Sequence, residues 1–271
     1  MFRVLLVGLL FTVSGCALTP MGRTNSIVVD GNSIQYVDAP GAGPTVVFES
    51  GLGDGLATWA EIYGEVREFA GAFAYSRPGY SAGLRRTDIG GARTADDAAK
   101  LLRDLLIDSG TPEPYVLVGH SIGGLYVLEF TRDYPELVAG LVLVDARLPE
   151  FTERCLAAGV MLCQPPAVAA LLAPPHVGAE IRGIPASEAD APSPADIGDI
   201  PVILVAATRP PLGGSDEAQA VWLAVQREFA ESLPKGRLVI ADGSGHYIQR
   251  EAPELVVNAI RRMTSTGETI E

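Results

Sequence analysis

Short apolar runs alternate with amphipathic helical patterns along most of the chain. Eight runs have the length and composition of buried strands, and they cover residues 26–29, 34–37, 44–48, 72–75, 115–118, 139–144, 201–207 and 237–241. Between several of them, apolar residues recur at helical spacing, as they do over residues 94–108 and 216–232. Strands that alternate with helices predict an α/β fold, here a mostly parallel eight-stranded sheet with helices on both faces.

One region breaks this alternation. From about residue 147 to residue 198, repeated prolines separate short apolar helical pieces such as Ala167 to Leu172. Because proline interrupts helices, the pattern predicts a segmented helical insertion after the sixth strand. An apolar, segmented insertion of this kind suits a lid above a binding site. A surface insertion with no role in binding is the alternative.

The N-terminus has the pattern of an export signal. Arg3 precedes the apolar run from Val4 to Val13, which is too short to span a bilayer permanently. The run leads into Val13-Ser14-Gly15-Cys16, which resembles a bacterial lipobox. We therefore expect a signal peptide over residues 1–15, a lipid on Cys16, a polar tether over residues 16–26 and a folded domain over residues 27–271. An ordinary signal peptide with an incidental cysteine is the alternative.

This N-terminus predicts a location in the bacterial cell envelope, held to a membrane surface through Cys16. Ala17 resembles the sorting pattern for the outer membrane, on its periplasmic side, if the host is Gram-negative. The formal net charge is −13 and the pI is about 4.7, with no basic cluster, so we expect no nucleic-acid partner and a soluble monomer. The neighbouring Cys155 and Cys163 would face an oxidising compartment, and we expect them to form a disulfide. Two buried free thiols are the alternative.

The most informative stretch is Gly119-His120-Ser121-Ile122-Gly123, which follows one apolar run and precedes a helical pattern. Gly-x-Ser-x-Gly between a strand and a helix is the nucleophile elbow, a tight turn that presents the serine above the sheet. The following helix N-terminus favours negative charge beside it. A serine that merely occupies a tight turn is the alternative. At this point the sequence resembles the α/β-hydrolase family.

Two further segments extend the resemblance over the whole mature chain. Residues 49–55, Glu-Ser-Gly-Leu-Gly-Asp-Gly, match the family's oxyanion loop, which implies an oxyanion hole made by the backbone N–H groups of Leu52 and Ile122. Gly51 and His120 would line the substrate pocket beside it. The segment that ends in His246 resembles the family's histidine loop and implies the general base. Ser121 would then be the nucleophile.

The third member of the triad is harder to place. The usual position, a few residues past the seventh strand, has no acid in Ala206-Ala207-Thr208-Arg209-Pro210-Pro211. Asp145, at the end of the sixth strand, matches the alternative placement found in part of the family, including haloalkane dehalogenases. We expect Asp145 to orient His246. Asp216, which also fits a helix N-cap, and Asp242 are the alternatives.

The resemblance implies a serine hydrolase that cleaves a carboxylic ester or related acyl bond of a small apolar substrate through an acyl-enzyme. It implies no cofactor, and no His or Cys cluster has metal-ligand spacing, so we expect no metal. Serine at the elbow argues against dehalogenases and epoxide hydrolases, which use aspartate there. A perhydrolase or acyltransferase on the same triad is one alternative, and a non-catalytic ligand-binding surface lipoprotein is another.

Overall fold

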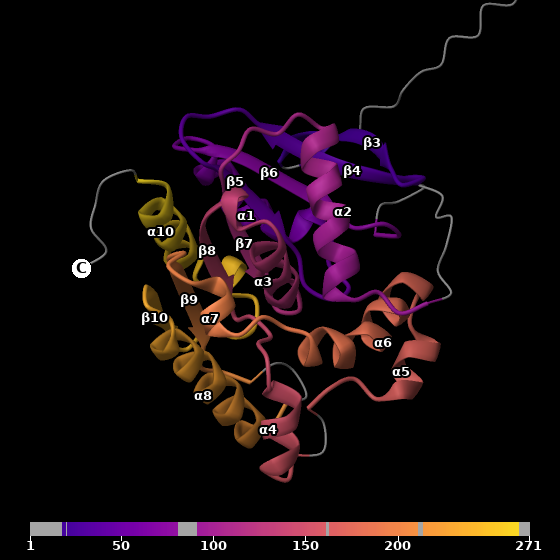
Figure 1. Cartoon of the computed structure of the whole chain (residues 1–271), viewed down its shortest axis with the longest axis vertical. Coiled ribbons are helices and arrows are strands. Elements are labelled where there is room, and N and C mark those ends of the chain that lie inside the picture. The colour runs from indigo at the N-terminus through magenta and orange to yellow at the C-terminus, as the bar shows by residue number, and fades with distance from the viewer. Residues whose placement is uncertain (1–17, 20, 81–90, 161–162, 211–213, 266–271) are drawn as a thin grey trace, which may run out of the picture.

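The computed structural model describes residues 18–19, 21–80, 91–160, 163–210 and 214–265. An eight-stranded sheet runs through its centre, and helices cover both faces (Figure 1). In spatial order the strands are β10 (Gly236–Ala241), β9 (Val202–Ala207), β8 (Val138–Val144), β7 (Tyr115–His120), β5 (Thr45–Glu49), β6 (Gly71–Ser76), β4 (Asn32–Ala39) and β3 (Asn25–Val29). Only the pairs β3–β4 and β4–β6 are antiparallel. The predicted fold class is confirmed.

Alternating side chains of the strands build two apolar cores, one on each face of the sheet. In β7, for example, Tyr115 and Leu117 join one core while Val116 and Val118 join the other. The first core is covered mainly by α2 (Ala95–Asp108), α3 (Gly123–Asp133) and α8 (Asp216–Ser232). The second is covered by η1 (Leu56–Trp59), α1 (Ala60–Val66), α9 (Ile248–Glu251) and α10 (Pro253–Thr264). A short η2 (Pro135–Leu137) leads into β8.

The segment before the sheet differs from the prediction of a tether over residues 16–26. Two short strands, β1 (Leu18–Thr19) and β2 (Gly22–Arg23), pair antiparallel, and β3 already begins at Asn25. Met21 between them is buried in the second core, because an apolar side chain here gains more from packing than from solvent. Residues 1–17, with the predicted signal peptide and Cys16, lie outside the described residues. In the described part, no helix is long and apolar enough to cross a membrane.

In the described residues between β8 and β9, where a helical insertion is predicted, there are four helices. They are α4 (Phe151–Ala157), α5 (Ala167–Leu172), α6 (Pro175–Ala189) and α7 (Pro194–Ile197). Figure 1 shows α5 and α6 set apart from the sheet at the lower right. We call residues 147–198 the inserted region.

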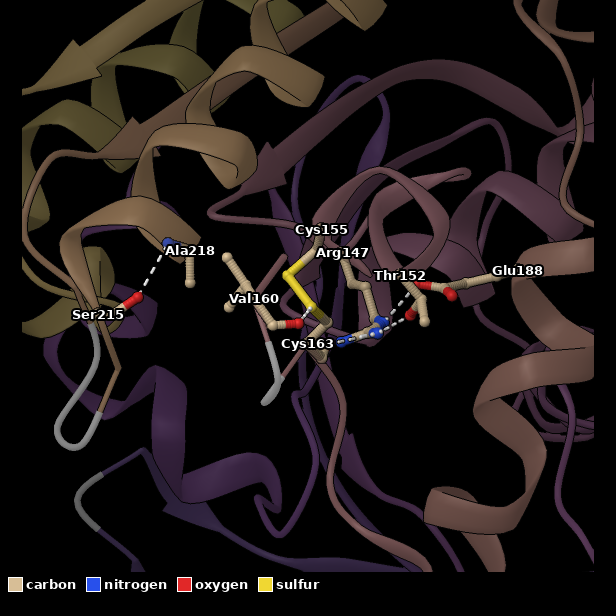
Figure 2. Close-up of a disulfide and its surroundings, with 8 residues drawn as sticks. All are labelled: Arg147, Thr152, Cys155, Val160, Cys163, Glu188, Ser215 and Ala218. Carbon is tan, nitrogen blue, oxygen red and sulfur yellow. Dashed lines mark hydrogen bonds and ion pairs between the residues drawn. A yellow bond between two sulfur atoms is a disulfide. The ribbon is translucent and has the colours of Figure 1, made fainter. Parts of the chain in front are cut away.

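A disulfide links two residues near the start of the inserted region. Cys155 and Cys163 form a disulfide with a Cα–Cα distance of 5.7 Å (Figure 2), and both side chains are buried in the first core. Beside it, the Arg147 guanidinium donates to Glu188, to the Thr152 hydroxyl and to the Cys163 carbonyl. Through Arg147, these contacts join Thr152 of α4 with Glu188 of α6 near the disulfide.

Candidate active site

The elbow places Ser121 in a conformation that side chains rarely adopt. Strand β7 ends at His120, α3 begins at Gly123, and Ser121 between them has φ 54°, in the left-handed region. A Cβ at Gly123 would lie 2.6 Å from the Glu49 carbonyl oxygen, so only glycine lets α3 approach β5 this closely. The turn therefore combines backbone strain with close contact, the combination that a nucleophile elbow requires.

His246 and Asp145 meet at the same edge of the sheet. His246 follows β10, and its Nδ1 lies 2.7 Å from Oδ2 of Asp145, which follows β8 and also has a positive φ, of 39°. The other oxygen, Oδ1, accepts from the Ala207 N–H at 3.1 Å, the Trp222 indole at 2.9 Å and the Gln226 amide at 3.2 Å. Since a carboxylate only accepts, Nδ1 of His246 carries the proton and Nε2 is left as the basic nitrogen.

Asp145 stays ionised in this environment although it is almost fully buried. Burial favours its neutral form, but the hydrogen bond and charge of His246, together with the Ala207 N–H and Gln226, outweigh burial and lower its pKa. A buried, ionised carboxylate on the imidazole stabilises the imidazolium that forms when His246 accepts a proton.

The two alternative acids lie in other environments. Asp216 is the first residue of α8, and the N-cap is Ser215, whose hydroxyl accepts from the Ala218 N–H, so the cap role proposed for Asp216 is wrong. Asp242 is exposed and accepts from the Thr208 hydroxyl at 3.4 Å. In the described part of the chain, Asp145 is the carboxylate paired with His246.

His120 joins the elbow to the histidine loop. Its Nε2 donates to the His246 carbonyl at 2.9 Å, and the two rings lie 4.7 Å apart. Its side chain is 1% exposed, which favours a structural role for His120 beside the elbow. Burial lowers its pKa to about 3, helped by the nearby His246, so it is neutral. The Ser121 hydroxyl donates to no described residue, and catalytic hydrogen bonds often tighten only around substrate.

Each of the two predicted oxyanion donors belongs to a peptide whose carbonyl is hydrogen-bonded. The Ile122 N–H shares a peptide with the Ser121 carbonyl, and the Leu52 N–H shares one with the Gly51 carbonyl. In a trans peptide, C=O and N–H point in opposite directions. The Ser121 carbonyl accepts from the N–H groups of Gly124 at 2.9 Å and Arg147 at 2.8 Å, which turns the Ile122 N–H the other way. The Leu52 and Ile122 N–H groups donate to no described residue, as donors kept for a substrate oxygen would.

The loop that carries Leu52 lies against the elbow. We call residues 49–55 the oxyanion loop. A Cβ at Gly51 would lie 2.8 Å from Nδ1 of His120 and 3.2 Å from Cβ of Ser121, so the loop backbone passes directly beside Ser121. The loop is also braced from within, because the Ser50 hydroxyl donates to the Gly55 carbonyl and accepts from the Trp59 indole.

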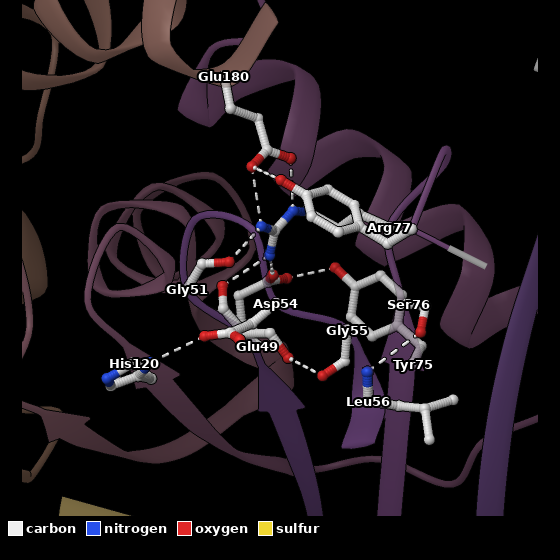
Figure 3. Close-up of polar contacts among 12 residues, drawn as sticks. Glu49, Gly51, Asp54, Gly55, Leu56, Tyr75, Ser76, Arg77, His120 and Glu180 are labelled. Carbon is white, nitrogen blue, oxygen red and sulfur yellow. Dashed lines mark hydrogen bonds and ion pairs between the residues drawn. The ribbon is translucent and has the colours of Figure 1, made fainter. Parts of the chain in front are cut away.

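A buried ionic cluster supports the other side of the oxyanion loop (Figure 3). The Arg77 guanidinium, 1% exposed, donates to the Ser50 carbonyl at 2.6 Å and the Gly51 carbonyl at 2.8 Å. Its remaining donors bind the carboxylates of Glu49 and Glu180, and Glu180 belongs to α6 of the inserted region. Tyr75 donates to Glu49.

The two carboxylates of the cluster respond differently to burial. For Glu180, burial is outweighed by the charges and hydrogen bonds of Arg77, Tyr80 and Arg93, and its pKa is lowered. For Glu49, which has fewer partners, burial prevails over Arg77 and Tyr75 and raises the pKa. Burial alone would lower the pKa of Arg77, but the two carboxylates raise it, so the guanidinium remains charged.

The described residues contain one group of carboxylates close enough to share a cation. Oxygens of Asp96, Glu129 and Asp133 lie within 4.8 Å of one another on α2 and α3. Arg132 pairs with Glu129 and Asp133, and Lys100 pairs with Asp96. Each of the three carboxylates thus already has a cationic partner from the protein itself, and the group contains none of Ser121, His246 and Asp145.

Sequence reasoning did not find the contacts that orient the site. An acidic residue at the end of a wholly apolar strand is a signal for Glu49, because carboxylates are rarely buried without a partner. Glu180, Trp222 and Gln226 carry no such signal, since each lies in a helical pattern that suits a surface position equally well. Arg77 lies in Ser76-Arg77-Pro78-Gly79-Tyr80, which resembles a family segment with an ordinary structural role.

Comparison with known proteins identifies the family to which the chain belongs. A model of the "Alpha/beta hydrolase family" matches residues 46–259. The chain belongs to this family. The elbow, the oxyanion loop and the histidine loop all lie within the matched residues, and their geometry is consistent with this family.

The individual relatives of this α/β hydrolase match only in part. It is 31% identical over 143 residues to the uncharacterized protein YqjL of Bacillus subtilis, covering 51% of this chain and 47% of that protein. It is 38% identical over 112 residues to a Variovorax paradoxus protein named "Putative carbamate hydrolase RutD", covering 41% of each. The chain thus spans less than half the length of these relatives. A thermophilic esterase from Thermogutta terrifontis has a TM-score of 0.63 and 20% identity, covering 89% of this chain and 99% of that one, a likeness of fold.

Proposed function

We propose that this α/β hydrolase is a serine esterase that cleaves a carboxylic ester or related acyl bond of a small apolar substrate. The observation that carries the proposal is the 2.7 Å pair between His246 and Asp145 beside a serine held in a strained elbow. Serine is a weak nucleophile at neutral pH and needs an oriented base, which this pair supplies.

The proposed reaction has two steps, acylation of Ser121 and deacylation by water, and His246 acts as base in both. Ser121 attacks the acyl carbonyl while Nε2 of His246 takes its proton, and the Leu52 and Ile122 N–H groups bind the oxyanion that forms. His246 then gives the proton to the leaving alcohol, which departs and leaves an acyl-enzyme on Ser121. Water attacks the acyl-enzyme with His246 again as base, and the acid is released. No step requires a metal or a cofactor.

Fluorophosphonate labelling and p-nitrophenyl ester turnover test this proposal. We expect the wild type to be labelled and to hydrolyse acetate, butyrate and decanoate esters, and we expect Ser121→Ala to lose both the label and about 10⁴-fold or more in kcat. His246→Ala should fall to a similar level. A folded wild type that neither labels nor turns over would favour a ligand-binding protein on this fold. Product analysis with peroxide or alcohol as acceptor separates a perhydrolase or acyltransferase from an esterase.

Carbamate hydrolysis is the second candidate, favoured by the name of the Variovorax relative. The same triad would attack the carbamate carbonyl. The measurement is kcat/KM for a p-nitrophenyl ester and the matching p-nitrophenyl N-alkyl carbamate. A higher value for the carbamate would replace the ester proposal with this one.

We further propose that the protein is anchored in the bacterial cell envelope through a lipid on Cys16. The support is the Val13-Ser14-Gly15-Cys16 pattern after a short apolar run. Expression in a bacterial host with a clickable fatty acid should label the wild type and place it in the membrane fraction. Cys16→Ser should remain unlabelled, and an equally labelled Cys16→Ser would refute the anchor.

A further inference from the structure

Arg77 uses every hydrogen-bond donor it has. A guanidinium carries five N–H groups. In Arg77, Nε binds Glu180 at 2.7 Å and Nη2 binds Glu180 at 2.9 Å, while the remaining three N–H groups bind Glu49, the Ser50 carbonyl and the Gly51 carbonyl. With no donor to spare, the position of the guanidinium is determined by Glu180 on one side and the oxyanion loop on the other.

The bond from Arg77 to the Gly51 carbonyl helps to set the direction of an oxyanion donor. The Gly51 carbonyl and the Leu52 N–H belong to one planar trans peptide and point in opposite directions. The Gly51 carbonyl accepts from Arg77 at 2.8 Å and, over the longer distance of 3.3 Å, from the Asp54 N–H of the same loop, so the shorter bond to Arg77 is the main one that turns the Leu52 N–H away from the cluster. Figure 3 shows Arg77 between Glu180 and the Gly51 carbonyl, so a displacement of Glu180 is transmitted through one guanidinium to this peptide.

Glu180 is itself placed by the inserted region. It lies on α6, is fully buried, and accepts from Tyr80 at 2.6 Å and from Arg93 at 2.9 Å as well as from Arg77. The Tyr80 hydroxyl in turn accepts from the Gly53 N–H of the oxyanion loop at 3.1 Å. Two routes, through Arg77 and through Tyr80, therefore connect one carboxylate of the inserted region with the oxyanion loop.

We propose that Glu180 and Arg77 are positioning residues that aim the Leu52 N–H at the oxyanion, so that the docked inserted region completes the oxyanion hole. This inference rests on the proposed hydrolase function. Neither side chain touches the substrate. Their effect is on the transition state, in which charge develops on the carbonyl oxygen, and not on binding of the neutral ester.

The experiment measures kcat and KM with p-nitrophenyl butyrate for the wild type, Glu180→Gln, Arg77→Lys and Tyr80→Phe. Gln keeps the shape of Glu180 but replaces one acceptor with a donor, and Lys cannot reproduce the planar fork of Arg77. We expect kcat to fall about tenfold in Glu180→Gln and about 100-fold in Arg77→Lys, with KM within about twofold. Tyr80→Phe removes one hydroxyl near the surface of the cluster, and its kcat should fall about threefold. This variant keeps the test possible if a variant at a buried residue does not fold.

A second substrate separates aiming from general damage. In the matching thionoester the carbonyl oxygen is replaced by sulfur, a weak hydrogen-bond acceptor that gains little from the oxyanion hole. The ratio of kcat/KM for ester and thionoester should therefore fall in Glu180→Gln and Arg77→Lys. Equal losses with both substrates, or a lower thermal stability with unchanged kcat, would overturn the inference.

Glu228→Gln is the matched control. Glu228 of α8 accepts two hydrogen bonds from Arg154 of α4, so it also connects the inserted region with the rest of the protein. These contacts do not include the oxyanion loop. Its kcat and its substrate ratio should equal those of the wild type. A wild type without Ser121-dependent turnover would overturn the proposed function and this inference together, whereas an active wild type with an unchanged Glu180→Gln would overturn only the inference.

Discussion

Helix α3 and helix α6 are both connected with the oxyanion loop, α3 by direct contact and α6 through intervening side chains. On the α3 side, the Gly123 backbone approaches the Glu49 and Ser50 carbonyls so closely that a Cβ would lie 2.6 Å and 2.8 Å from them. On the α6 side, Glu180 reaches the loop through the buried charge of Arg77. One side is thus set by close backbone contact and the other by an ionic cluster.

The difference teaches how each side responds to change. Close backbone contact is insensitive to pH and salt, and it fails when any atom is added. A buried ionic cluster tolerates small shifts of its helix, but its strength depends on the protonation of its carboxylates. Ser121, the proposed nucleophile, therefore lies next to the rigid side, and Leu52, one of the two proposed oxyanion donors, is connected with the adjustable side. The expected effects on turnover rank accordingly.

Apart from Ser121 and His246 themselves, the largest effect is expected for Asp145→Asn, at the carboxylate paired with His246 and outside both contacts of the oxyanion loop. The amide cannot stabilise the imidazolium and favours the wrong tautomer of His246, so kcat should fall by about 10³–10⁴-fold. The measurement is single-turnover acylation with p-nitrophenyl butyrate. Asp216→Asn, at the start of α8, is the control and should remain close to the wild type. A reversed pattern would move the triad acid to Asp216.

The second effect is expected for Gly123→Ala. The added Cβ would meet backbone atoms of β5 that have no room to move, so we expect a loss of about 3 kcal/mol in the free energy of unfolding together with displacement of the elbow. Urea unfolding and active-site titration measure the two losses. Gly64→Ala, in α1 with open space around the glycine, should be neutral or slightly stabilising. Full activity in Gly123→Ala would refute the close-contact account of the α3 side.

The third effect is the pH dependence of the stability that is lost in Glu180→Gln. The folded pKa of Glu180 lies below its unfolded value of about 4.3, so its contribution to stability is present above that pH and is lost as the pH falls through the folded pKa. The stability difference between the wild type and Glu180→Gln should be about 2 kcal/mol at pH 7 and should shrink below about pH 4. Thermal unfolding from pH 7 to pH 3.5 measures this difference. A difference that grows on acidification would contradict the lowered pKa.

The smallest effect on turnover is expected for the double variant Cys155→Ser, Cys163→Ser. The bond closes a short loop of sequence separation 8, so its removal should cost about 2 kcal/mol of stability. Neither cysteine contacts the triad or the oxyanion loop, and kcat should stay within about twofold of the wild type. Parallel thermal unfolding and ester turnover test this. A large fall in kcat would show that α4 also supports the catalytic groups.

Local sequence patterns predicted the parts of the molecule that depend on local physics. Strand periodicity and the glycine spacing around Ser121 depend on a few neighbouring residues, and the eight-stranded sheet follows from them. The choice of Asp145 came instead from the family resemblance, in which part of the family carries an acid at the end of this strand. The partnership of Arg77 with Glu180 spans 103 positions, and nothing near either residue encodes it. The burial of His120 could not be predicted for the same reason, because it packs against Trp59 and Tyr247, far away in sequence.

The two tryptophans of the chain have a consequence for spectroscopy. Trp59 donates its indole N–H to Ser50 in the oxyanion loop, and Trp222 donates to Asp145 in the triad. All indole fluorescence of this protein thus comes from rings hydrogen-bonded to residues of the proposed active site. The enzyme carries two optical reporters without any label, one beside each half of the site. Replacing either one by phenylalanine leaves a signal from the other alone, so that movement of the loop and charging of the triad can be followed separately in real time.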